Sequence, residues 1–128
     1  NPETGKGMLG KAAEIFAALV ARESGPGDIV ESAKYRLAKT HEKLGDSAAA
    51  LALYLDLLYQ YDLDLKAGKV RDWYYFGRSG YDAARLLVLK DAFEHAARVY
   101  ECLARAHIPT AADALAKARE IRLNHGLD

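Results

Sequence analysis

The chain has 128 residues, the length of one domain, of which 51% are hydrophobic and 28% are charged. This composition excludes an intrinsically disordered chain, and because 18 basic residues balance 18 acidic residues, no bulk field attracts nucleic acid or an anionic membrane. The longest apolar run is far shorter than the ~20 residues that a membrane span needs. We therefore expect one globular domain with no membrane span and no nucleic-acid partner.

Two helices are predicted in the first third of the chain. Residues 1–7 contain a proline and two glycines and are expected to form a loose lead-in. Apolar residues at three- and four-residue steps predict a helix over 8–22. A second helix is predicted over 28–44, where Asp28 followed by Glu31 forms a capping-box pattern.

The stretch over residues 48–61 is the one around which the other helices are expected to pack. Only Asp56 and Gln60 are strongly polar in it, and their spacing of four places them on one line of a helix. Such a helix must be covered on most of its circumference, so we expect packing partners on two sides. Gly45 can close the preceding helix in the left-handed conformation and Asp46 can cap the next one, which predicts an αα-hairpin.

The second half of the chain predicts three further helices. Residues 62–68 are expected to be a linker, and a helix is predicted over 69–89. Gly77 and Gly80 either allow close backbone packing in this helix or break it, and we favour the continuous helix. After a turn near residues 90–91, a fifth helix carries apolar residues from Phe93 to Leu103. Pro109 ends the next connection, and Thr110 with Asp113 predicts a capped sixth helix that ends at His125-Gly126.

An internal repeat runs through these helices. Three segments share an alanine, an aromatic residue four positions later and a leucine three positions after that. They are Ala12/Phe16/Leu19, Ala50/Tyr54/Leu57 and Ala96/Tyr100/Leu103, which start 38 and 46 residues apart. A small alanine lets the neighbouring helix approach, while the two larger residues fill the space on the next turns.

This pattern resembles the tetratricopeptide repeat, a helical hairpin of about 34 residues. In residues 33–62 the matching residues are Leu37, Ala38, Gly45, Asp46, Ala50 and Tyr54, whereas Lys34, His41 and Asp62 depart from the family pattern. In residues 77–109 the matching residues are Ala83, Ala84, Leu87, Phe93, Ala96, Tyr100 and Pro109. The resemblance implies a half repeat over 8–27, repeats over 28–64 and 69–109, the second with an insertion, and a closing helix over 110–124.

The resemblance also implies a binding groove, because the first helix of each tetratricopeptide repeat lines a concave surface that holds peptides. It places nine residues there: Ser32, Tyr35, Lys39, Glu42, Lys43, Arg78, Tyr81, Arg85 and Val88. Basic and aromatic side chains of this kind suit the carboxylates of a peptide. The alternative is an ordinary solvated helix face.

Other candidate sites have simpler explanations. The residues Trp73, Tyr74, Tyr75 and Phe76 form either a binding platform or, as we favour, mostly core. The four histidines show no metal-ligand spacing, so we expect no metal and no cofactor. Asp62 and Asp64 are expected to solvate the linker, and Cys102 is expected to be an unreactive packed thiol.

We therefore predict an all-α, right-handed α-α superhelix of about six antiparallel helices that is not an enzyme and binds a protein or peptide partner in its groove. The alternative is a structural role as the end of a longer repeat array that mediates self-association, so a homo-oligomer stays open. Because the chain starts at Asn1 without an initiator methionine, we expect a piece of a longer protein. A similarity in style to tetratricopeptide proteins of bacterial envelopes favours a periplasmic or envelope location.

Overall fold

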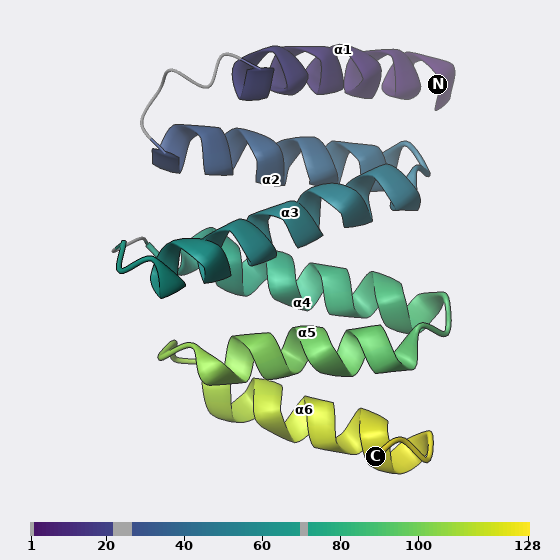
Figure 1. Cartoon of the computed structure of the whole chain (residues 1–128). Helices are drawn as coiled ribbons and strands as arrows, with labels where there is room; N and C mark the ends of the chain where they lie inside the picture. The colour runs from purple at the N-terminus through teal and green to yellow at the C-terminus, as the bar shows by residue number, and fades with distance from the viewer. Residues whose placement is uncertain (1, 22–26, 70–71) are drawn as a thin grey trace. The chain divides into compact units, whose positions relative to one another are not determined.

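The computed structural model describes residues 2–21, 27–69 and 72–128, which form six α-helices and no strand (Figure 1). The predicted all-α class is confirmed. The chain divides into two compact units, Asn1–Leu57 and Leu58–Asp128. The boundary falls inside the third helix, which contributes its first turns to one unit and its last turns to the other.

The first unit contains α1 (Pro2–Ala21), α2 (Gly27–Lys43) and the start of α3 (Ser47–Lys66), and α1 packs against α2. Because α1 begins at Pro2, the expected loose lead-in over residues 2–7 is wrong. Proline is tolerated in the first turn, where its missing N–H group has no intrahelical acceptor. Asp28 lies inside α2 and not at its cap, since the helix begins one residue earlier; its side chain lies outside the described part of the chain.

The turn between α2 and α3 has the predicted geometry. Gly45 has a φ of 84°, and the backbone N–H groups of Gly45 and Asp46 donate to the carbonyls of Glu42 (3.0 Å) and His41 (2.8 Å). These two bonds form a Schellman motif. Oδ1 of Asp46 then accepts from the N–H of Ala49 at 3.1 Å, which caps α3 as predicted.

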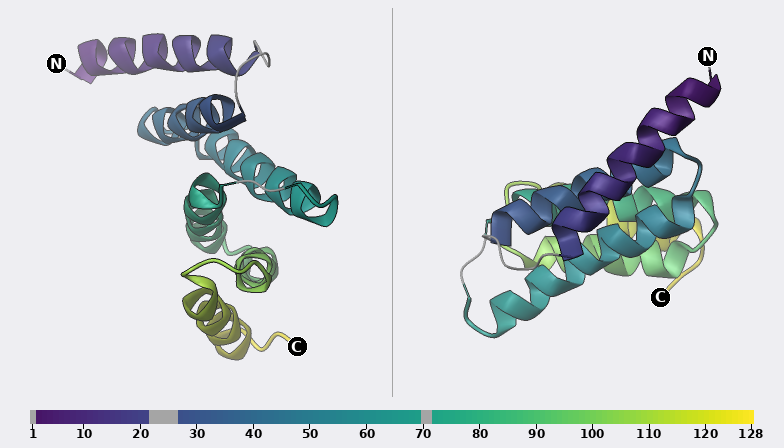
Figure 2. Two further views of the ribbon diagram at one scale, coloured as in Figure 1. Left: turned by 90° about the vertical axis from the view of Figure 1, so that its left-hand side faces the viewer. Right: turned by 90° about the horizontal axis from the view of Figure 1, so that it is seen from above.

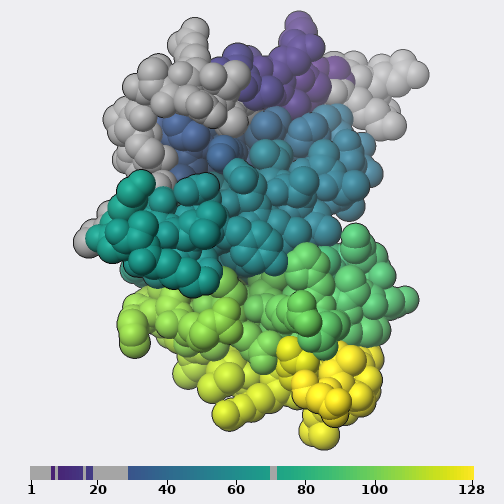
Figure 3. Space-filling model, in the orientation of Figure 1, coloured from purple at the N-terminus to yellow at the C-terminus, as the bar shows by residue number. Residues whose placement is uncertain are grey.

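The second unit contains the end of α3, α4 (Tyr74–Leu89), α5 (Phe93–Arg105) and α6 (Ala111–Asn124). The helices α4, α5 and α6 lie side by side in sequence order, each antiparallel to the one before (Figures 1 and 2). Leu58, Leu87, Val99 and Leu103 are almost fully buried and form the centre of the unit. In the space-filling view the yellow C-terminal residues lie against the green part of the same unit (Figure 3).

The end of α3 differs from the predicted linker. The helix continues to Lys66, where Nζ pairs with Oδ2 of Asp62 at 2.9 Å, four residues earlier. Asp64 is only 5% exposed and accepts from Nε2 of Gln60 at 3.2 Å, whereas Leu63 is exposed. The expectation that Asp62 and Asp64 solvate a linker is therefore wrong.

The helix α4 begins at Tyr74, five residues after the predicted start, and is continuous through both glycines as predicted. Gly80 faces α5 so closely that a Cβ atom there would lie 2.7 Å from both δ carbons of Leu103. At Gly77 the nearest side-chain atom would be Cε3 of Trp73 at 3.6 Å, an ordinary contact. Of the two glycines in α4, Gly80 is therefore the one at which a Cβ atom would displace a side chain of α5.

The start of α6 lacks the predicted cap. Thr110 occupies the N-cap position without a side-chain cap hydrogen bond. Further along, Nη2 of Arg122 donates to Oε1 of Glu101 at 2.7 Å and Nη1 donates to Oε2 of Glu94 at 3.0 Å. These two bonds keep the guanidinium charged, so the pKa of Arg122 is raised, and they join α6 to α5.

No described helix is long and apolar enough to cross a membrane.

Candidate functional site

In the first unit, three predicted groove residues on α2 surround Tyr54 of α3. The ring of Tyr35 lies 5.7 Å from the ring of Tyr54, and the ammonium of Lys39 lies 5.5 Å and 5.7 Å from their two centroids. The hydroxyl of Tyr54 donates to Oε1 of Glu42 at 2.6 Å. Tyr35 is only 7% exposed, whereas Lys43 is exposed. The aromatic area of this set is therefore used within the unit.

In the second unit, five residues of α4 form a continuous line that we call the α4 stripe. They are Tyr74, Arg78, Tyr81, Arg85 and Val88. Steps of four and three residues keep them on one side of the helix. All are exposed except Tyr81, which is half-buried, so the stripe presents two guanidinium groups, two phenol rings and an aliphatic side chain. Four of the five were predicted groove residues, and Tyr74 was not.

The two arginines of the α4 stripe are positioned by contacts on their own helix. The guanidinium of Arg78 lies 5.3 Å from the ring centroid of Tyr74 and donates to its hydroxyl. Nη2 of Arg85 lies 3.1 Å from Oδ1 of Asp82, three residues earlier. Each of the two guanidinium groups therefore has a partner on α4 itself.

Tyr81 connects the α4 stripe to α6. Its hydroxyl donates to Oδ2 of Asp113 at 2.6 Å, and its ring meets the edge of Tyr100 at 5.4 Å. Burial raises the pKa of Tyr81, and the hydrogen bond to Asp113 raises it further, so the phenol stays protonated and donates. Asp113, expected to be a capping partner of Thr110, is therefore a partner of Tyr81 on α4, and no sequence pattern indicated this contact.

The aromatic cluster at the start of α4 is divided between core and surface. Phe76 is buried and stacks on Tyr61 with centroids 4.1 Å apart. Trp73 and Tyr74 are exposed, at 40% and 41%. The prediction of a mostly buried cluster is confirmed for Phe76 alone, because Tyr75 is half-buried and the other two residues are exposed.

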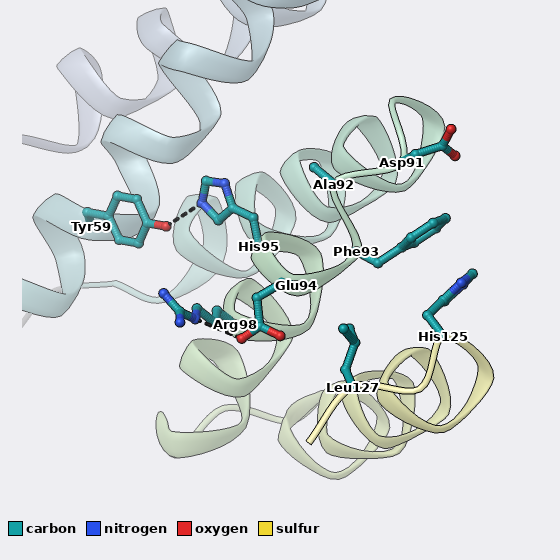
Figure 4. Close-up of a pocket in the computed structure, with 9 residues that line it drawn as sticks. All are labelled: Tyr59, Asp91, Ala92, Phe93, Glu94, His95, Arg98, His125 and Leu127. Carbon is teal, nitrogen blue, oxygen red and sulfur yellow. Dashed lines mark hydrogen bonds and ion pairs between the residues drawn. The ribbon is translucent and has the colours of Figure 1, made fainter.

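A hollow of about 840 Å³ lies at the start of α5 in the same unit (Figure 4). The hydroxyl of Tyr59 and Nε2 of His95 form a hydrogen bond of 2.9 Å on one side of it. On the other side Phe93 and His125 stack with centroids 3.5 Å apart. Arg98 lies at its rim and is paired with Glu94 at 3.0 Å. No sequence motif pointed to this hollow.

Both charged and uncharged polar side chains line the hollow, and Asp91, Glu94 and Arg98 are the charged ones. Burial lowers the pKa of His95, and the charges of Lys90 and Arg98 lower it further, so the imidazole is neutral at pH 7.

The described residues contain no group of histidine, cysteine and carboxylate side chains arranged to hold a metal ion. Cys102 is buried and its pKa is raised by that burial, as expected for a packed thiol.

Comparisons with protein-family models, with curated proteins and with solved structures find no match to this chain. The resemblance to tetratricopeptide repeats therefore stays a prediction, and the function must be inferred from the surface of the chain itself.

Proposed function

We propose that the chain is a non-catalytic protein-interaction module that binds an acidic segment of a partner polypeptide along the α4 stripe. The observation that supports this proposal is the line of alternating phenol and guanidinium groups on an exposed helix face. Tyrosine and arginine are enriched at interface hot spots, and guanidinium groups pair with carboxylates in a fixed geometry. The right-handed superhelix and the tetratricopeptide groove that the sequence predicts are part of this proposal.

The α2 residues have a smaller role in this proposal. Lys43 is the exposed member of the α2 set, whereas Ser32, Lys39 and Glu42 are half-buried. Exposed ion pairs typically contribute about 0.2–1 kcal/mol each, so useful affinity requires several contacts together.

Affinity capture from a lysate of the source organism tests this function. The native chain is compared with a double variant, Arg78→Glu with Arg85→Glu, and with a control double variant, Arg105→Glu with Arg119→Glu. The control makes the same change in net charge at two exposed arginines outside the α4 stripe. A protein retained by the native chain and the control but lost by the stripe variant supports the proposal, whereas equal capture by all three refutes it.

A second function, self-association as part of a longer array, is favoured by exposed apolar residues on two other helices. Ile15 on α1 is 61% exposed and Leu123 on α6 is 82% exposed. Sedimentation equilibrium of the native chain and of Leu123→Glu separates this function from the first. Self-association is supported if the native chain forms an oligomer and Leu123→Glu is a monomer. It is excluded if the native chain is a monomer at all concentrations.

A further inference from the structure

The hollow at the start of α5 has the size of a small-molecule site. Its volume of about 840 Å³ lies within the range of about 300–1,000 Å³ that is typical of ligand pockets. Tyr59 and His95 line one side of it, and Phe93, His125 and Leu127 line the other (Figure 4). The described residues that line the hollow are all different from those of the α4 stripe, so a ligand here is independent of the function proposed above.

The Tyr59–His95 pair retains hydrogen-bonding capacity for a ligand. The phenol oxygen and Nε2 lie 2.9 Å apart, and within the described residues neither side chain has another hydrogen-bond partner. Because the imidazole is neutral, it carries one N–H group and one unprotonated nitrogen. If Nε2 donates to the phenol oxygen, the O–H group remains as a donor and Nδ1 as an acceptor. If the phenol donates to Nε2, the N–H group at Nδ1 remains as a donor and the phenol oxygen as an acceptor.

The charged residues of the hollow disfavour a ligand of either charge. Oε1 of Glu94 pairs with Arg98 at 3.0 Å and its Oε2 pairs with Arg122 at 3.0 Å, so these charges are already compensated within the unit. Besides burial, nearby positive charges lower the pKa of His95, and the same charges disfavour a cation beside the imidazole. The carboxylates of Asp91 and Glu94 disfavour an anion. An uncharged polar group is therefore favoured.

The opposite side of the hollow is aromatic. The rings of Phe93 and His125 lie 3.5 Å apart between centroids and are tilted by only 10°, so they form one stacked surface. Leu127 lies beside them (Figure 4). An aromatic ring that packs on such a surface gains a preferred ring geometry beyond the burial of area, which a saturated ring of the same size does not.

We propose that the hollow binds an uncharged aromatic amide, whose ring lies against Phe93 and His125 and whose amide group forms hydrogen bonds with Tyr59 and His95. The amide N–H donates to the remaining acceptor of the pair, and the amide carbonyl accepts from the remaining donor. An amide satisfies both groups in either tautomer of the imidazole. This chemistry occurs in free aromatic carboxamides and in the aromatic residues of a polypeptide.

Titrations of the full chain followed by ¹H–¹⁵N NMR test the inference with benzamide and four analogues. Cyclohexanecarboxamide lacks the aromatic ring, acetophenone lacks the amide N–H group, and benzoate and benzamidine carry a negative and a positive charge. Benzamide is expected to shift the amide signals of residues 92–95 saturably, with a dissociation constant on the order of millimolar. It is expected to bind at least about threefold more tightly than each analogue. Equal binding of any one analogue, or shifts outside the hollow, would refute the proposal.

A sixth probe identifies the source of the ligand. N-Acetylphenylalaninamide presents the ring and the amide group as an aromatic residue of a polypeptide does. If it binds more tightly than benzamide, the hollow takes a residue of a partner chain. If benzamide binds more tightly, the hollow takes a free aromatic carboxamide.

Two variants assign the two sides of the hollow. Tyr59→Phe with His95→Phe is expected to weaken benzamide about threefold or more and to abolish its preference over acetophenone. The matched control, Tyr74→Phe with His107→Phe, makes the same changes at two exposed residues outside the hollow and is expected to bind as the native chain does. Phe93→Leu is expected to abolish the preference over cyclohexanecarboxamide alone. Circular dichroism checks the fold, and if the double variant loses helicity, Phe93→Leu decides the test. A folded variant that keeps the preference it is designed to remove would overturn the assignment.

Discussion

Gly45 and Asp91 occupy the same position in two turns, with left-handed φ values of 84° and 62°. At Asp91 the N–H donates to the carbonyl of Val88 at 3.0 Å, and the N–H of Ala92 donates to Leu87 at 2.8 Å, the same pair of bonds that closes α2. A side chain in this conformation strains the backbone, whereas glycine does not. The two positions therefore differ in strain and not in hydrogen bonding.

We predict opposite effects of two substitutions at these positions. Gly45→Ala is expected to lower the free energy of unfolding by about 1–2 kcal/mol, because the left-handed conformation disfavours a Cβ atom. No atom lies within 4 Å of that Cβ, so a steric clash does not contribute. Asp91→Gly is expected to raise the free energy of unfolding by up to about 1 kcal/mol. Urea unfolding measures both, and changes of the same sign would contradict the account.

His95 makes stability depend on pH. Its pKa is lowered from 6.5 in the folded chain, so the unfolded chain binds more protons as the pH falls below about 6.5. The contribution of His95 is therefore fully present above that pH and is lost as the pH falls toward the lowered folded pKa.

His95→Gln is expected to weaken the loss of stability between pH 7.5 and 5.5, and His107→Gln, at an exposed histidine outside the hollow, serves as the matched control. Urea midpoints at several pH values measure the effect. If the pH dependence of His95→Gln and of the native chain coincides, the neutral Tyr59–His95 pair has no influence on stability.

At the scale of the helix, α4 depends on one glycine and not on the other. Gly80→Ala is expected to destabilise the chain by about 1–3 kcal/mol, because Leu103 must move to admit the Cβ atom. Gly77→Ala is expected to be neutral or to stabilise by up to about 1 kcal/mol, because alanine favours the helix and meets only an ordinary contact with Trp73. Thermal unfolding of the two variants measures the difference, and equal midpoints would contradict close packing of α4 on α5.

The sequence predicted helices well where periodicity and turn residues agree. The hairpin at Gly45 and Asp46 and the helix through Gly77 and Gly80 are confirmed, because glycine geometry and apolar spacing are local signals. The end of α3 could not be predicted, since its Asp-Leu-Asp-Leu alternation resembles a strand or linker, and Asp64 is buried through tertiary contacts while Leu63 is exposed. The pattern of apolar and polar residues does not predict burial where packing places a polar residue inside and an apolar residue at the surface.

The candidate site could be predicted in part. Alignment to the repeat named Arg78, Tyr81 and Arg85, because residues on one side of α4 recur at helical spacing. The partnership of Tyr81 with Asp113 joins residues 32 positions apart and depends on the packing of both α4 and α6 against α5. The burial of Tyr35 against Tyr54 likewise depends on tertiary contacts, so its use within the unit could not be read from a helix pattern.

At the scale of the whole molecule, the balance of 18 basic and 18 acidic residues gives no long-range field. Binding at the α4 stripe therefore depends on short-range pairs between exposed charges. Because the screening length falls from about 10 Å at 0.1 M salt to about 3 Å at 1 M, binding of an acidic peptide is expected to weaken several-fold over this range. Anisotropy titrations at both salt concentrations measure this, and an unchanged affinity would indicate that apolar contacts dominate.

The measurement that tests the central claim most directly is a two-dimensional ¹H–¹⁵N NMR titration of the full chain with an acidic peptide. We predict that the largest shifts occur in residues 74–88, including the side-chain Nε signals of Arg78 and Arg85, and that the stripe variant abolishes them. Shifts that gather at Phe93 and His125 around the hollow, or at Leu115 and Leu123 on α6, would contradict binding along the α4 stripe.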